Sequence, residues 1–215
     1  TEGSGHRGRA AVAPEWSIRG LRGARFVRNP DRRFTMRIEP ATQHDLGDIR
    51  AAYEHGRVIQ RDQGSIVWPE FTDAAILAEV ESRRLFRVVD DDAIVGTFSI
   101  AYEDPAIWGS HERGAHLYLH RIARAAHYPG RGLMDAILAW AVHECARLGR
   151  DGLRVDTWAS NAALIGFYQG RGFRLVAERR LGADPRLPPH YHGNAFALLE
   201  RPCERLHPGS ATVTL

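Results

Sequence analysis

A glycine-rich loop near the middle of the chain has the residue types that bind phosphate. It lies in LYLHRIARAAHYPGRGLM, residues 117–134, where an apolar strand-like run precedes the loop and a helical pattern follows it. The backbone N–H groups of Gly130, Arg131, Gly132 and Leu133 would lack helical partners there, so they could donate hydrogen bonds to an anion. Gly-x-Gly also occurs in plain turns, and by itself it is a weak signal.

A second motif strengthens the first. The run NAALIGFYQGRGF begins at Asn161, after a predicted strand, and covers a predicted helix. Together the two motifs resemble those of the GNAT acyltransferase superfamily. That family has R/Q-x-x-G-x-G/A after its fourth strand and N-x-x-A-x-x-x-Y-E-x-x-G-F beyond its fifth. The resemblance covers about Met36 to Arg201.

Three positions depart from the family pattern. Pro129 stands where the family has Arg or Gln, and it offers neither a side-chain donor nor an N–H. Met134 replaces a small residue, and Leu164 replaces Ala. These changes predict weaker diphosphate binding, or binding carried by Arg131 and the remaining amides. The alternative function is therefore a non-catalytic sensor domain that binds CoA or another nucleotide.

The resemblance implies transfer of an acyl group, usually acetyl, from acetyl-CoA to an amine of a small molecule or peptide. The amine would attack directly in a ternary complex. Tyr168 occupies the family's general-acid position, and a phenol can protonate the departing thiolate. The N–H of His120 is the candidate donor to the thioester oxygen. Asn161 often bonds the pantetheine arm in the family, and it is also a suitable helix N-cap. The other residues implied for the cofactor are Ile122, Ala123, Arg124, Gly130, Arg131, Gly132 and Leu133.

The general base has more than one candidate. His116 aligns with a base Glu of several protein acetyltransferases, and an imidazole exchanges protons near neutral pH. A strand residue with local hydrogen bonds is an equally good interpretation of His116. Glu103 and Asp104 end a predicted strand and could take the proton directly or through water. A polar turn before Pro105 is the simpler interpretation of that pair.

The acceptor site is predicted from the family's architecture. There, the first two helices and the loop after the third strand usually wall it. In this sequence those segments carry aromatic and acidic side chains, which would suit a cationic amine. The predicted acceptor residues are Trp68, Tyr102, Asp104 and Trp108.

No metal is predicted from the sequence. His116 and His120 would lie about 13 Å apart along a strand. The sequence offers no evident third metal ligand to accompany His190 and His192. We interpret the segment around them as a loop or a wall of the acceptor site.

The elements that must position these residues alternate along the chain. Predicted strands cover 37–41, 85–89, 93–102, 115–123, 153–157, 173–178 and 194–200. Predicted helices cover 42–60, a segment opening at 71–73, 131–148 and 161–170. This order indicates one mixed α/β domain. The resemblance implies a mostly antiparallel sheet of six or seven strands flanked by about four helices.

Composition limits the remaining possibilities. All 29 basic residues of the 215 are Arg. Residues 1–35 hold eight of them against three acids, and the rest of the chain has 21 against 23. Nucleic-acid binding by the main domain is therefore not indicated. We expect residues 1–35 to be a disordered or non-native Arg/Gly-rich extension. The more specific alternative is an arm that binds RNA. The acyltransferase domain is predicted at 36–201, followed by a tail at 202–215.

The cellular setting is inferred from what the composition lacks. Two cysteines cannot build a disulfide framework. No apolar run approaches the ~20 residues that span a bilayer. We expect a cytoplasmic protein that does not associate with membranes, and a homodimer is possible because dimers are common in the family.

Overall fold

The computed structural model describes residues 36–203. The predictions for residues 1–35, including the RNA-binding arm, and for most of the C-terminal tail lie outside the described residues. The described part belongs to the second of two units into which the chain divides, Phe34–Leu215.

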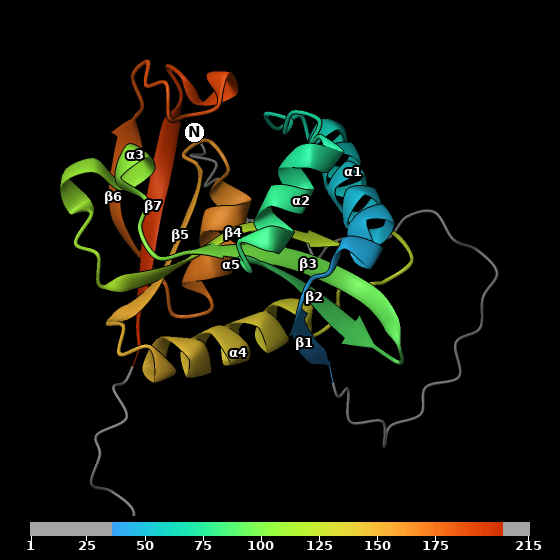
Figure 1. The fold of residues 1–215 in the computed structure, drawn as a ribbon. Coiled ribbons are helices and arrows are strands. Elements are labelled where there is room, and N and C mark those ends of the chain that lie inside the picture. Colours follow the sequence, from blue (N-terminus) through green and yellow to red (C-terminus); the bar gives the residue numbers. More distant parts are fainter. Residues whose placement is uncertain (1–35, 204–215) are drawn as a thin grey trace, which may run out of the picture. The chain divides into compact units, whose positions relative to one another are not determined.

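One seven-stranded sheet forms the centre of this unit (Figure 1). Its strand order is β1-β2-β3-β4-β5-β7-β6. β4 and β5 pair in parallel, and the other neighbouring pairs are antiparallel. The predicted mostly antiparallel sheet is thus confirmed. The strands are β1 (Arg37–Pro40), β2 (Leu85–Asp90), β3 (Ala93–Ala101), β4 (His116–Arg124), β5 (Gly152–Trp158), β6 (Arg174–Arg180) and β7 (Ala195–Pro202).

The described residues contain five α-helices, most of which begin at caps visible in the sequence. The Thr72 hydroxyl accepts from Ala75 N–H, and the Asn161 side chain accepts from Leu164 N–H at 3.0 Å. The sequence analysis missed one helix, a single turn capped by Asp104, where it predicted a polar turn. The helices are α1 (Leu46–Asp62), α2 (Asp73–Glu81), α3 (Pro105–Trp108), α4 (Leu133–Arg147) and α5 (Ala162–Gln169). None of them is long and apolar enough to cross a bilayer.

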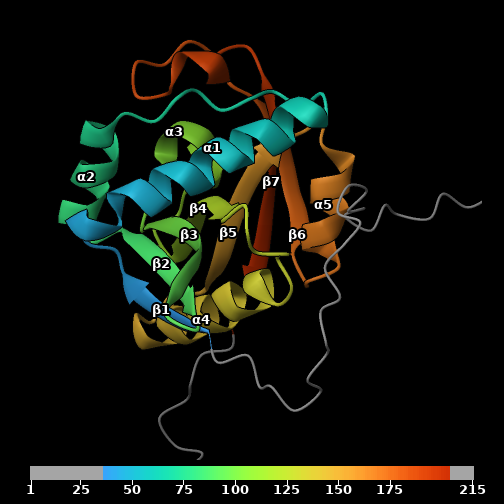
Figure 2. The ribbon, with the colours of Figure 1, turned by 90° about the vertical axis from the view of Figure 1, so that its right-hand side faces the viewer.

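Helices cover both faces of the sheet (Figures 1 and 2). Leu117 and Leu119 of β4 pack in the cluster that contains the buried side of α4 and also Tyr168 of α5. Between them, Tyr118 points to the opposite face and packs with Trp108 of α3. α1 and α2 form a third cluster with Leu85. The β4 side chains therefore alternate between two cores.

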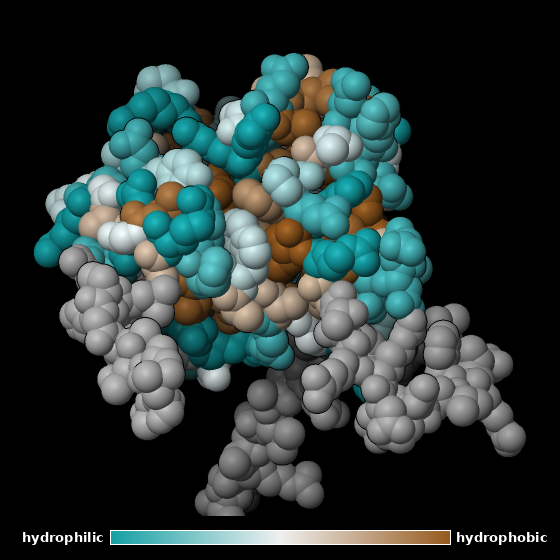
Figure 3. Space-filling model, turned by 60° about the horizontal axis from the view of Figure 1, so that its bottom comes forward, coloured by the Kyte–Doolittle hydropathy of each residue, from teal (hydrophilic) through white to brown (hydrophobic). Residues whose placement is uncertain are grey.

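The surface on the α4 side is mixed in character. Figure 3 views the molecule from this side, and hydrophobic and hydrophilic residues are interspersed on it. Within residues 36–203, the large hydrophobic residues that are exposed are Val58, Ile66 and Leu175. Single exposed apolar side chains of this kind are normal for a globular surface.

Gly96 of β3 fixes the start of α4. A Cβ at this position would lie 2.9 Å from a Leu133 methyl group and 3.0 Å from the Ala123 carbonyl oxygen. Gly96→Ala is therefore expected to lower the free energy of unfolding by about 1–3 kcal/mol through overpacking. Gly47→Ala in α1 is the control, because open space surrounds that position and Ala is the better helix former. Urea denaturation should show opposite signs, and equal effects would contradict this explanation.

Candidate active site

β4 and β5 diverge in the middle of the sheet. They pair only from His116 opposite Gly152 to Tyr118 opposite Arg154. Beyond this point β4 continues along β3, and β5 continues along β7 as far as Trp158. The facing edges of the two strands therefore have no sheet partner beyond Tyr118 and Arg154. The predicted cofactor segment, residues 120–124, follows this free part of β4.

Three side chains from three elements meet where the strands separate. Asp104 caps α3, His120 lies on β4 and Asp156 lies on β5. The Asp104 Oδ2 atom is 3.6 Å from His120 Nε2, and Asp156 Oδ1 is 3.5 Å from His120 Nδ1. One ligand-type atom of each residue lies within 4.8 Å of the others. The two carboxylates thus face different nitrogens of one imidazole.

Burial controls the charge of these carboxylates. It raises the pKa of Asp156 to about 6, with the negative charge of Asp104 adding to the effect and His120 opposing it. Burial also raises the pKa of Asp104, against the attraction of His120. The group can therefore gain or lose a proton near neutral pH, as a general base must.

Asp156→Asn should stabilise the fold at high pH. The pKa of an unfolded Asp is about 3.9, so a folded pKa of about 6 means that the folded state binds this proton more tightly. The free energy of unfolding therefore falls as the pH rises from about 4 to 6, and the full loss is reached above pH 6. At pH 8 the variant should gain about 2–3 kcal/mol in free energy of unfolding, and little below pH 4. Urea titrations at both values test this, with exposed Asp62→Asn as control. A destabilised variant at pH 8 would contradict it.

Tyr168 of α5 interacts electrostatically with Asp156 of this group. It is the buried residue of that helix, with 6% exposure, and its ring contacts Phe167 and Phe173 edge to face. The sequence analysis assigned the packing role to Phe167 and Leu164, yet both are only half-buried and Tyr168 itself packs in the core. Burial raises the pKa of Tyr168, and the charge of Asp156 raises it further. The phenol therefore stays protonated and lies within electrostatic reach of Asp156.

The glycine loop has a left-handed backbone at two positions, and the Leu133 N–H donates within it to the Gly130 carbonyl at 3.4 Å. Gly130 and Gly132 have φ values of 82° and 72°, in the left-handed region that glycine tolerates. The Arg124 guanidinium donates to the Tyr128 carbonyl at 2.7 Å, and the Tyr128 hydroxyl donates to the Arg131 carbonyl at 2.8 Å. The loop is thus held by its own side chains.

The other predicted cofactor residues differ in their burial and packing. Arg131 is exposed at the start of α4, whereas Leu133 is buried and packs in the α4 core. Ile122 is half-buried against the same core, and Ala123 is buried under α1. Met134 replaces a small residue of the family, and it packs half-buried on the α4 core.

His116 lies outside the group at the strand divergence. It is buried at the paired end of β4, with Nε2 3.2 Å from Glu200 Oε2. Burial, reinforced by the charge of Arg154, lowers its pKa. Four strand residues, about 13 Å, separate it from His120. The structure therefore places His116 in a buried polar network, apart from the group at the strand divergence.

The remaining predicted residues mostly serve packing. Trp108 is fully buried, with the Arg154 guanidinium 4.1 Å from its ring centre, so it cannot contact an acceptor. Tyr102 lies against the guanidinium groups of Arg84 and Arg150. Trp68 packs on Tyr53 and Phe71 between α1 and α2, and Glu103 is exposed. Of the predicted acceptor residues, only Asp104 lies in the group with His120.

The sequence analysis missed Asp156, and it considered Tyr191 only as part of a segment interpreted as a loop or a wall of the acceptor site. Asp156 is the single acid in the apolar strand LRVDTW, and an unexplained acid in a buried strand is a usable signal. Tyr191 belongs to the HYH segment, and its ring packs on Trp158 and Phe196. Burial raises the pKa of Tyr191, and the charges of Asp156 and Asp104 raise it further. Tyr191 therefore lies within electrostatic reach of the two carboxylates.

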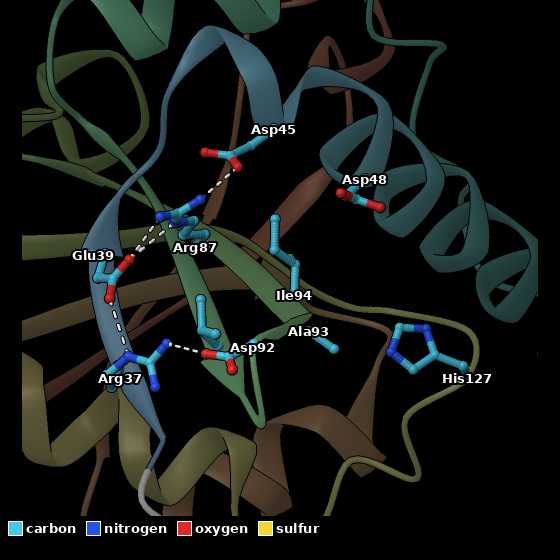
Figure 4. Close-up of a pocket in the computed structure, with 10 residues that line it drawn as sticks. Arg37, Glu39, Asp45, Asp48, Arg87, Asp92, Ala93, Ile94 and His127 are labelled. Atoms are coloured by element: carbon cyan, nitrogen blue, oxygen red, sulfur yellow. Dashed lines mark hydrogen bonds and ion pairs between the residues drawn. The ribbon is translucent and has the colours of Figure 1, made fainter.

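A separate cavity of about 470 Å³ lies near β1 and the start of α1 (Figure 4). Most of its charged side chains pair with one another. Arg37 contacts Glu39 and Asp92, and Arg87 contacts Glu39 and Asp45. These pairs stabilise the β1–β2 edge, and the cavity includes none of the residues at the strand divergence.

Comparison with known proteins identifies the fold and the family. The model of the acetyltransferase (GNAT) family matches residues 51–173. The uncharacterized N-acetyltransferase YesJ of Bacillus subtilis is 25% identical over 153 residues, which cover 67% of this chain and 82% of that protein. A GNAT-family acetyltransferase structure from Streptococcus agalactiae superimposes with a TM-score of 0.63 at 17% identity, covering 80% of this chain and 98% of that one.

A third relative is described with its cofactor. The structure of yncA, a putative acetyltransferase of Salmonella typhimurium with acetyl-CoA, has a TM-score of 0.57 and 16% identity, covering 82% of this chain and 99% of that one. The family model spans more than half of the chain. The protein belongs to the GNAT acetyltransferase family.

Proposed function

We propose that this protein transfers an acetyl group from acetyl-CoA to an amine nitrogen. The observation that carries the proposal is the group of Asp104, His120 and Asp156 where β4 and β5 separate, together with the buried Tyr168, which lies within electrostatic reach of Asp156. These residues would supply a general acid, Tyr168, and a group of proton acceptors. The glycine loop at the start of α4 follows the same strand and suits a diphosphate.

Each part of the reaction is assigned to residues of this chain. The loop amides near Gly130 and Gly132 would hold the diphosphate, and the free edge of β4 would lie along the pantetheine arm. An N–H of β4 near His120 would stabilise the negative charge that develops on the thioester oxygen. The amine nitrogen attacks the carbonyl carbon, and the carbon–sulfur bond breaks. His120 with its two carboxylates accepts the amine proton, and Tyr168 gives a proton to the departing thiolate.

A second candidate function is a sensor that binds CoA without catalysis. Pro129 removes a donor from the loop, and Met134 fills a position that is usually small. Both changes bear on cofactor affinity rather than on Tyr168 or the carboxylates. Binding without turnover would favour this candidate.

Calorimetry separates cofactor binding from the rest of the proposal. Acetyl-CoA, free CoA and ATP would each be titrated into the full chain. We expect micromolar binding of acetyl-CoA, about −8 kcal/mol, and little binding of ATP. Absence of acetyl-CoA binding would mean that Pro129 and Met134 have disabled the loop, and it would contradict the proposed function.

A further inference from the structure

We propose that Cys145 and Cys203 are a modification site, at which a small hydroperoxide converts the two thiols into a reversible disulfide. These are the two cysteines of the chain, so one bond within the chain uses both. Neither cysteine belongs to the group of acidic residues and His120 at the strand divergence. The bond therefore does not depend on the proposed acetyl transfer.

The fold brings the two cysteines together from distant positions in the sequence. Cys145 lies in the last turn of α4, and Cys203 directly follows β7, which ends at Pro202. The C-terminal end of α4 lies next to the end of β7 (Figure 1). Both cysteines are buried in the same core cluster.

The connection between α4 and β5 holds both cysteines by hydrogen bonds. The Arg150 N–H donates to the Cys145 carbonyl at 2.8 Å, and the Cys145 thiol is 3.5 Å from the Arg150 carbonyl oxygen. The Cys203 N–H donates to the Asp151 carbonyl at 3.0 Å. Because Arg150 and Asp151 are consecutive residues, these contacts keep the two cysteines close to one another.

The side chains of the two cysteines face one another. The Cys145 thiol donates a hydrogen bond to the Cys203 sulfur, which also accepts from the Leu153 N–H. Disulfides require two side chains that point toward each other at short range. Bond formation between these sulfur atoms therefore needs a small side-chain movement and no change in strand pairing.

The surroundings make Cys203 the more reactive cysteine. The hydrogen bond from Cys145 lowers the pKa of Cys203 against the effect of burial, and the charge of Arg201 lowers it further. The same hydrogen bond, together with burial, raises the pKa of Cys145. Cys203 is also 8% exposed, whereas Cys145 has no exposed surface. Since the thiolate is the nucleophile, Cys203 reacts first and Cys145 completes the disulfide.

The hydroperoxide supplies the oxidising equivalents for both thiols. The Cys203 thiolate attacks one peroxide oxygen, the O–O bond breaks, and Cys203 becomes a sulfenic acid. The other oxygen leaves as an alcohol, or as water, with the proton that Cys203 had lost. The Cys145 sulfur then attacks the Cys203 sulfur, and the S–O bond breaks to release water with the Cys145 proton. One peroxide is thus reduced as two thiols are oxidised, and a dithiol reverses the reaction by exchange.

The disulfide would enclose β5, α5, β6 and β7 in one covalent loop. A cross-link of this kind restricts the unfolded chain, and the restriction grows with the length of the loop. The oxidised protein is therefore expected to have a Tm about 5 °C or more above that of the reduced protein.

The test treats the reduced full chain with one equivalent of hydrogen peroxide at neutral pH. Free thiols, counted after denaturation, should fall from two per chain to almost none. The mass should decrease by about 2 Da, the loss of two hydrogens, with no change in size on a non-reducing gel. Dithiothreitol should restore both thiols. Calorimetric scans of the oxidised and reduced forms measure the difference in Tm.

Two serine variants test the order of the steps. Cys145→Ser should stop at the sulfenic acid of Cys203, which dimedone traps. Cys203→Ser should lose its remaining thiol roughly 10-fold more slowly or less, because Cys145 is buried and stays protonated. Circular dichroism verifies that each variant folds. The unaltered chain carries the main test without any substitution.

Several results would overturn the inference. Retention of both thiols would do so, and so would a disulfide that joins two chains. A bond that forms in urea but not in buffer would show that the folded structure does not favour it. An oxidised protein with a lower Tm would show that the bond distorts the fold. Equal oxidation rates in the two serine variants would contradict the role of Cys203 as the first cysteine to react.

Discussion

Tyr168→Phe is expected to lower kcat roughly 100-fold while the Kd for acetyl-CoA changes less than about twofold. The substitution removes only the hydroxyl group. The phenylalanine ring can keep the edge-to-face contacts with Phe167 and Phe173. Because burial raises the pKa of Tyr168, the phenol holds its proton until a thiolate develops next to it. Steady-state release of CoA and calorimetric binding of acetyl-CoA measure the two quantities.

Tyr102→Phe is the matched control for this experiment. Its ring is half-buried against Arg84 and Arg150, on the core cluster that also contains Tyr168. The loss of that hydroxyl should leave kcat within about twofold. Wild-type kcat in Tyr168→Phe would remove Tyr168 as the general acid. An equal loss in both variants would point to a general effect on the fold.

Arg154→Met is expected to lower the free energy of unfolding by about 3–5 kcal/mol. The Arg154 side chain is 3% exposed. It donates to Glu200 at 2.9 Å, to the Tyr118 hydroxyl at 2.8 Å and to the His111 carbonyl at 2.9 Å. Methionine would leave Glu200 as a largely buried carboxylate without its principal partner. Urea denaturation at neutral pH measures the loss.

Arg174→Met provides the control, because Arg174 contacts the same carboxylate from solvent. Its guanidinium is 3.0 Å from Glu200 Oε1, and its side chain is 69% exposed. An exposed pair contributes about 0–1 kcal/mol. A loss below about 1 kcal/mol in Arg154→Met would contradict the view that this buried network holds the paired end of β4 and β5 together.

The sequence predicted most of the fold because its longer elements have clear periods. The stripe of α4, including Leu133, Ile137 and Cys145, is buried as its 3.6-residue spacing predicts. The side-chain caps at Thr72 and Asn161 are also where their residue types indicate. α3 was missed because four residues are too few to show a period. Its cap, Asp104, was instead interpreted as part of a turn.

The site was predicted only where a local motif marks it. The glycine loop and Tyr168 belong to such motifs. The His120 side chain does not, and the sequence analysis considered only its backbone N–H. The side chains of His116 and His120 lie on the same side of β4. Which of them faces an open edge depends on the residue at which β5 stops pairing with β4. Asp156 and Tyr191 come from other elements, so only the tertiary structure brings Asp156 to His120 and Tyr191 within electrostatic reach of Asp156.

Acetylation of a simple amine tests the central claim most directly. The full chain would be incubated with acetyl-CoA and a panel of primary amines, with CoA release followed as free thiol and the product identified by mass spectrometry. We predict an N-acetylated amine in step with CoA release, and a strong reduction of both in Tyr168→Phe. Acetyl-CoA that binds but is never consumed with any amine would contradict the acyltransferase function and favour the non-catalytic sensor.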